Sequence, residues 1–323
     1  MEFRFLAFLP FRRDSDLYYR FPAPPTDGSS VMMPHTSIYC FLACYVVAFG
    51  LELTRFRGKS TVSRLFSLGF TGAGLLAHTW YLLNRSYETS LPPLLSSTHD
   101  WMLVAAWLVV LIYLVLAVLQ NEMAIGVFVL PVVLVLVAST YGLNHAPNNE
   151  IYAMQARRSW GLLHAGLLVF GVVAAAGGLL SAIMYLLQHR RLKTRHAQPG
   201  GFQMPSLPRL AQANRWAFLL SFVLLTLGYA SGLMLTIAAP DEEASVSLME
   251  PVVLISGGVW TLMAGVVGWL LVHRGPVGRQ VAWLTIVGLG CLLLTLFGLQ
   301  LATGNIHSGS RSAAHAVQPE VRR

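Results

Sequence analysis

Charged residues are scarce in this sequence. Of its 323 residues, 11% are charged and 55% are hydrophobic, and the mean hydropathy is +0.60. An average soluble domain has roughly 25% charged residues, so the composition excludes an ordinary soluble fold and indicates an integral membrane protein. The formal net charge is +8, but no basic patch interleaved with aromatic residues occurs in a polar domain. Nucleic acid is therefore not an expected partner.

Cysteine and acidic residues are also few. The three cysteines, Cys40, Cys44 and Cys291, form no CxxC or CxxCH motif, which argues against a dithiol oxidoreductase and against a c-type cytochrome. Acidic residues are almost absent from the long apolar stretches, and Glu52 is an exception inside the first of them. A proton-coupled transporter is expected to carry more of them, since intramembrane carboxylates serve as proton relays.

Long apolar stretches dominate the sequence instead. Eight of them are long enough to cross a hydrocarbon core of about 30 Å, and helix is the structure that satisfies their backbone in lipid. They are residues 36–54, 65–83, 100–119, 123–143, 159–187, 215–239, 251–272 and 280–302. We therefore predict an all-α integral membrane protein, built as a bundle of about eight transmembrane helices.

Basic residues predict the orientation of this bundle. The loops after the first, fifth and seventh stretches contain twelve Lys and Arg residues, whereas the opposite short loops contain Arg85, Arg157 and Arg158. The positive-inside rule places the twelve in the cytoplasm and both termini outside. We expect a multi-pass protein of the bacterial cytoplasmic (inner) membrane, in contact with the lipid bilayer along residues 35–302.

Two polar segments flank the predicted bundle. Residues 1–34 are predicted to be flexible, and Met32 or Met33 is an alternative start of the chain. Residues 303–323 are predicted to be a polar tail. Neither segment has the hydrophobic content that a folded domain needs.

Histidine is the ionisable residue that stands out, with ten copies. His164 is predicted to lie about 7 Å inside the fifth helix, at 1.5 Å per residue, and Trp160, four residues earlier, lies on the same helix face. His307 follows the last predicted helix by about five residues. Neutral imidazole is the usual protein ligand of haem iron. A facing pair of His164 and His307 therefore predicts haem-iron ligation at the outer membrane face.

Several local sequences support this hypothesis by resemblance. The stretch Leu163-His164-Ala165, the helix exit from Tyr185 to Lys193, and the end Gly304-x-x-His307-Ser308 resemble the transmembrane domain of cytochrome c assembly proteins. That family includes CcsA, CcmC and HemX-type members. The similarity extends over roughly residues 65 to 308.

The resemblance implies a haem-handling role in cytochrome c assembly. It implies that His164 and His307 ligate a transiently held b-type haem, with Trp160 beside it, and that apocytochrome c and a second membrane assembly protein are partners. His273 is similar to an inner-side histidine of the CcsA branch, and His78 to a histidine in the second helix of HemX-like members. A non-enzymatic haem chaperone or assembly factor is expected rather than a complete cytochrome c synthetase.

One departure from the family pattern leaves an alternative open. Haem-handling members carry a tryptophan-rich WWD motif in an outer loop, whereas the corresponding loop here, Pro240 to Glu250, has no tryptophan. HemX-like members lack this motif as well. The alternative is a membrane regulator of tetrapyrrole biosynthesis without bound haem, which would contact glutamyl-tRNA reductase through the basic segment Arg190 to Arg195. That segment is equally explained as a topology signal.

Overall fold

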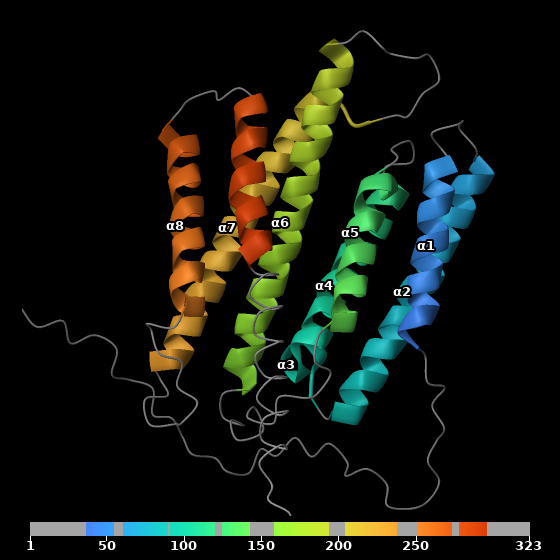
Figure 1. The fold of residues 1–323 in the computed structure, drawn as a ribbon, viewed down its shortest axis with the longest axis horizontal. Helices are drawn as coiled ribbons and strands as arrows, with labels where there is room; N and C mark the ends of the chain where they lie inside the picture. Colours follow the sequence, from blue (N-terminus) through green and yellow to red (C-terminus); the bar gives the residue numbers. More distant parts are fainter. Residues whose placement is uncertain are drawn as a thin grey trace, which may run out of the picture. The chain divides into compact units, whose positions relative to one another are not determined.

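A computed structural model describes residues 37–54, 61–89, 91–119, 125–142, 158–193, 204–237, 251–272 and 278–295 (Figure 1). All regular structure within these ranges is helical. The predictions for residues 1–34, the outer loop Pro240 to Glu250 and the tail 303–323 lie outside them.

Each of the eight predicted stretches contains a helix. They are α1 (Ile38–Thr54), α2 (Thr61–Thr89), α4 (Thr98–Leu119), α5 (Gly126–Ser139), α6 (Arg158–Lys193), α7 (Leu207–Ile237), α8 (Pro251–Val272) and the segment Gly278–Thr295. The all-helical prediction is thus confirmed. The structure adds a short helix α3 (Pro93–Ser96) and a 3-10 turn η1 (Thr140–Gly142), which were not predicted.

Four of these helices are long and apolar enough to cross a membrane, as expected for a multi-pass membrane protein. They are Thr98–Leu119, Trp160–Lys193, Leu207–Leu235 and Gly278–Thr295. Shorter apolar helices occur at Ile38–Thr54, Gly126–Ser139 and Leu254–Leu270. The 17 residues of α1 give a helix of about 25 Å at 1.5 Å per residue, somewhat less than a hydrocarbon core of about 30 Å. The count of eight spans and the outside location of both termini stay predictions.

The helices share two main hydrophobic cores, and α6 contributes to both. Residues of α1, α2, α4 and α5 form the first core, which includes Phe41, Leu103 and Leu130. The second core includes Phe218 of α7 and Met263 of α8. Helix α6 places Val169 and Val173 in the first core and Val172 and Ala175 in the second. It therefore joins the two groups of helices.

Glycines allow α6 and α7 to approach closely along their length. The Cβ atom of an alanine at Gly228 would lie 2.8 Å from a methyl carbon of Leu168, and one at Gly171 equally close to Leu225. Such small residues are the usual means by which membrane helices pack, since lipid provides no hydrophobic force between them. Because the two helices are antiparallel, the start of α6 lies beside the second half of α7. We call this end of the molecule the His164 end.

At the opposite end, the carboxyl group of Glu52 is buried against the start of α5. Glu52 is 1% exposed and accepts a hydrogen bond from the Ser67 hydroxyl at 3.0 Å. Its Cδ atom would lie 3.0 Å from a Cβ atom built on Gly126, the first residue of α5. The free N–H groups and the dipole of a helix N-terminus favour a negative charge at this place. This contact explains why an acid is tolerated inside an apolar bundle.

This packing predicts that Gly126→Ala destabilises the protein. The new methyl group would collide with the Tyr113 hydroxyl and lie 2.9 Å from Glu52 Cγ, and overpacking of this kind typically costs about 1–3 kcal/mol. Thermal unfolding in detergent measures the effect. Gly177→Ala in α6 is the matched control, because no atom lies within 4 Å of its Cβ position, and we expect no loss of stability there. Equal melting temperatures for the two variants would contradict the prediction.

Candidate functional site

His164 is a predicted site residue whose ring contacts small residues of a neighbouring helix. It lies in the second turn of α6, and its Nδ1 atom is 2.8 Å from the carbonyl oxygen of Gly228 and 3.2 Å from the Ser231 hydroxyl oxygen, both in α7. The Ser231 hydroxyl donates to the same carbonyl at 2.7 Å. A Cβ atom at Gly232 would lie 2.8 Å from Cε1 of the imidazole. The ring therefore rests on three small residues of α7, which we call the histidine seat.

The histidine seat determines which nitrogen of His164 is available to a ligand. A carbonyl oxygen only accepts hydrogen bonds, so Nδ1 carries the hydrogen and donates it to Gly228. The lone pair of the neutral ring is then on Nε2. Metal-binding histidines almost always donate their second ring N–H to a carbonyl or carboxylate in this way, which fixes both tautomer and ring orientation. The partly exposed ring of His164 has the chemistry of a metal ligand.

The start of α6 around His164 is covered in part by other elements. Trp160 lies one turn before His164 and is 51% exposed. Leu95 of α3 lies 3.5 Å from the Cβ position of Gly161, so the short helix α3 packs against the first turn of α6. An exposed aromatic side chain thus lies one helical turn before His164, and α3 borders the same turn.

The other predicted histidines are not brought to this site by the described residues. His307 and His273 lie outside the described ranges. His78 is 0% exposed and packs against α1. Its ring is stacked on that of Phe41, with a distance of 4.2 Å between the ring centroids and an interplanar angle of 1°. Its Nδ1 atom is 3.3 Å from the Tyr45 hydroxyl, and within the described ranges Nε2 has no hydrogen-bond partner. Haem ligation by His78 stays a prediction, and it would require this packing to open.

Asp100 is a buried polar residue that was not predicted as a functional residue. It lies in the first turn of α4, is 0% exposed, and accepts hydrogen bonds from Arg85 Nε at 3.1 and 3.2 Å and from His99 Nδ1 at 3.0 Å. The Ser96 hydroxyl of α3 donates to it as well. We call Arg85, Ser96, His99 and Asp100 the Asp100 cluster. Asp100 is thus a second acidic residue within the predicted spans, besides Glu52.

A sequence signal for the Asp100 cluster exists. Ser97 precedes α4, and its hydroxyl oxygen accepts a hydrogen bond from the backbone N–H of Asp100 at 3.1 Å. A serine followed three residues later by an acid, just before an apolar run, is the pattern of a capping box. The pattern predicts the helix start correctly but gives no indication that Arg85, from another helix, completes the cluster.

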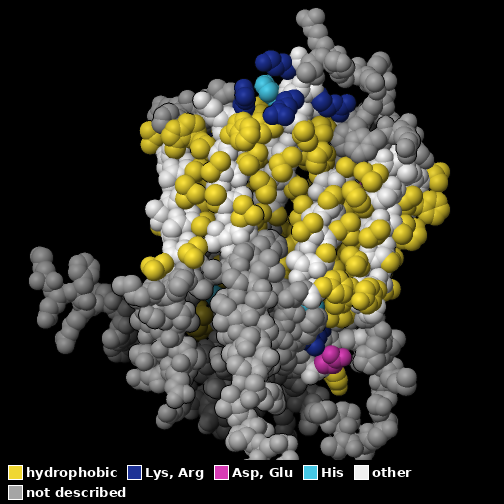
Figure 2. Space-filling view, viewed as in Figure 1, with side chains coloured by type: hydrophobic (Ala, Val, Ile, Leu, Met, Phe, Trp, Pro, Cys, Tyr) yellow, Lys and Arg dark blue, Asp and Glu magenta, His cyan; other side chains and the backbone are white. Residues whose placement is uncertain are grey.

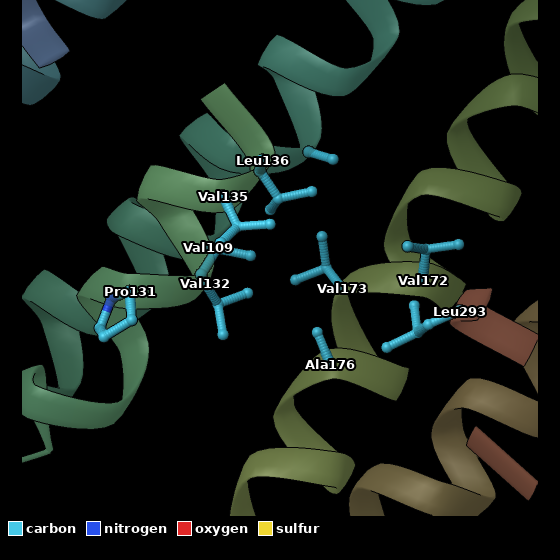
Figure 3. A pocket seen from close by; sticks show the side chains of 10 residues that line it. Val109, Pro131, Val132, Val135, Leu136, Val172, Val173, Ala176 and Leu293 are labelled. Atoms are coloured by element: carbon cyan, nitrogen blue, oxygen red, sulfur yellow. The ribbon is translucent and has the colours of Figure 1, made fainter. Parts of the chain in front are cut away.

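An apolar cavity between the two groups of helices is not a candidate for haem ligation. Its volume is about 230 Å³, and α4, α5 and α6 line it together with Leu293 (Figure 3). The side chains are Ala105, Val109, Pro131, Val132, Val135, Leu136, Val172, Val173, Ala176 and Leu293. None of them can ligate iron or pair with a carboxylate. Among the described residues, moreover, no group of three or more His, Cys, Asp and Glu side chains is placed to hold a metal ion.

One of the comparisons with known proteins gives a match, and it is to a family model. The model of a family described as "Cytochrome C assembly protein" matches residues 95–307, which is more than half of the chain. The match begins in α3, later than the predicted start at residue 65, and it includes His164, the histidine seat and His307. Neither the curated proteins nor the solved structures give a match.

Proposed function

This chain belongs to the cytochrome c assembly protein family, and from that premise we propose that it holds a haem for cytochrome c biogenesis, with His164 as one axial ligand. The observation that supports this most directly is the hydrogen bond of 2.8 Å between His164 Nδ1 and the Gly228 carbonyl. It leaves Nε2 with the lone pair that an iron ligand needs.

We propose that His307 is the second axial ligand. Both histidines fall within the family match, and two imidazoles complete the six-coordination of a porphyrin-bound iron. The histidine seat holds the ring of His164 through three residues of α7, so we propose that His164 remains bound to the iron while the haem is transferred. Exchange of the haem with a receiving protein would then begin at His307.

The proposed setting is the outer face of a bacterial cytoplasmic membrane. Apocytochrome c is the proposed recipient, in cooperation with a second membrane assembly protein, and haem is the cargo. We propose a chaperone role rather than complete synthetase activity, because the loop Pro240 to Glu250 has no tryptophan. Trp160 supplies one exposed aromatic ring near the proposed ligand, and stacking contacts of this kind add about 0.5–1.5 kcal/mol.

An absorption spectrum of the full chain, purified in detergent from haem-replete cells, tests the proposal. The wild-type protein is expected to show a low-spin Soret band. His164→Ala and His307→Ala are each expected to lower haem retention at least about tenfold, since losing even a hydrogen-bond partner of a metal ligand lowers metal affinity about 10–100-fold. Added imidazole should restore the low-spin spectrum of His164→Ala.

A histidine far from the site provides the control. His189 lies near the other end of α6, where its ring is stacked on that of Tyr185 with 6.2 Å between the ring centroids. His189→Ala should therefore leave haem retention unchanged. A colourless wild-type protein, or an unaltered spectrum in the double variant of His164 and His307, would refute the ligand assignment. A colourless protein that binds glutamyl-tRNA reductase would instead support the regulatory role.

A further inference from the structure

Six cationic side chains gather at the end of the molecule opposite His164. They share a position at the ends of three helices and form what we call the basic rim, which consists of Arg190, Arg191 and Lys193 of α6, Arg209 and Arg215 of α7, and Arg279. Figure 2 shows Lys and Arg side chains clustered at one end of the molecule, around a histidine. Because α6 and α7 are antiparallel, the last turn of α6 and the first turns of α7 meet there.

No acidic side chain of these helices balances the basic rim. Helices α6, α7 and α8 and the segment Gly278–Thr295 contain no Asp or Glu, and the sequence has none from Ile151 to Pro240. Arg190 and Arg191 make further interactions within the chain. Lys193, Arg209, Arg215 and Arg279 are exposed. Clustered like charges repel one another and attract anions, so the basic rim is suited to a ligand that brings several negative charges.

Two exposed tryptophans indicate the depth of the basic rim in the membrane. Trp216 directly follows Arg215 and is 65% exposed, and Trp283, one helical turn after Arg279, is 47% exposed. Tryptophan is enriched where the hydrocarbon core meets the headgroups. Arg209 and Arg215 are six residues apart, which is about 9 Å along a helix. That distance is close to the thickness of one interfacial layer, about 5–8 Å, and together with the tryptophans it favours a position of these cations at the level of the lipid headgroups.

We propose that the basic rim is a binding site for anionic phospholipids. The guanidinium groups of Arg209, Arg215 and Arg279 would pair with headgroup phosphates, which they match in a bidentate geometry, while Trp216 and Trp283 contact the lipid below the phosphate. A soluble protein or a nucleic acid fits less well, because the tryptophans place the cations at the depth of the headgroups. The proposal goes beyond haem handling and does not depend on it.

The test measures which lipid the purified protein retains. The full chain in detergent is mixed with equal amounts of phosphatidylglycerol and phosphatidylcholine, and native mass spectrometry counts the bound molecules of each. We expect the wild-type protein to be enriched in phosphatidylglycerol. Each Lys or Arg near an anionic lipid surface raises the affinity about fivefold. The triple variant Arg209→Gln, Arg215→Gln, Arg279→Gln should therefore lower the preference for phosphatidylglycerol on the order of a hundredfold.

Three controls separate charge from folding. The same three residues changed to lysine should retain most of the preference, and Gln212→Ala with Gln280→Ala, two exposed neutral residues of the same helices, should retain all of it. High salt should weaken the preference of the wild-type protein, a result that needs no variant to fold. Equal retention of both lipids by the wild-type protein, an unchanged preference in the glutamine variant, or binding of RNA without lipid preference would overturn the proposal.

Discussion

Gly232→Leu is expected to lower haem retention as much as the loss of His164 itself, at least about tenfold. The imidazole lies directly over Gly232, because a Cβ atom there would be 2.8 Å from Cε1, 3.3 Å from Nδ1 and 3.6 Å from Nε2 of His164. A leucine side chain cannot occupy this space while the ring donates to the Gly228 carbonyl. The variant keeps every proposed iron ligand, and it removes only the surface on which one of them rests.

The measurement is the Soret absorbance of equal amounts of purified protein, together with its melting temperature. Gly177→Leu in α6 is the matched control, since Gly177 is exposed and has no atom within 4 Å of its Cβ position. We expect the control to bind haem as the wild-type protein does. A Gly232→Leu protein that remains folded and retains a normal low-spin spectrum would show that the seat does not hold the ligand.

The position of His164 near the start of an apolar helix could be predicted from the sequence, but its seat could not. His164 stands out because few ionisable residues occur in an apolar helix, and Trp160 lies one turn away. Gly228 and Ser231 are 64 and 67 residues farther along the chain, and only the packing of α7 against α6 brings them to the ring. Small residues in α7 predict close helix packing, but they do not reveal that an imidazole is among the side chains they contact.

The helices were largely predictable because long apolar runs leave no alternative in lipid. The helix ends were less predictable. Helix α6 continues to Lys193 and α7 begins at Leu207, beyond the apolar stretches that end at 187 and begin at 215. Arginine and lysine are good helix formers, and cations in the last turn of α6 interact favourably with the helix dipole. Polar residues can therefore extend a helix past the hydrophobic core without a signal in hydropathy.

Helix α2 lies outside the family match yet is tied to the matched region by specific polar contacts. The Trp107 indole N–H of α4 donates to the Thr79 hydroxyl of α2 at 2.8 Å, and Arg85 of α2 contacts Asp100 of α4. On the other side of the cluster, Ser96 belongs to α3, which packs through Leu95 on Gly161 of α6. The Asp100 cluster thus connects α2 and α4 to the helix that carries His164.

Asp100→Leu is therefore expected to destabilise the protein by about 3–5 kcal/mol, the usual cost of removing one partner of a buried ion pair. The carboxylate accepts both contacts from Arg85 Nε and is fully buried, whereas the Arg85 side chain is 18% exposed. Without Asp100, the guanidinium group, the Ser96 hydroxyl and the His99 ring lose a common acceptor. Unfolding by sodium dodecyl sulfate in mixed micelles measures the difference in free energy.

Two further variants separate the buried pair from the surrounding charges. Glu88 is 3.9 Å from the same arginine, but its side chain is 52% exposed, so Glu88→Gln should cost no more than about 1 kcal/mol. The double variant Arg85→Leu, Asp100→Leu should recover much of the stability lost in Asp100→Leu, because replacing a whole buried pair by apolar residues is often neutral. If the single and double variants were equally unstable, the loss would come from the hydrogen bonds of Ser96 and His99, and the arginine would not be the partner that requires the carboxylate.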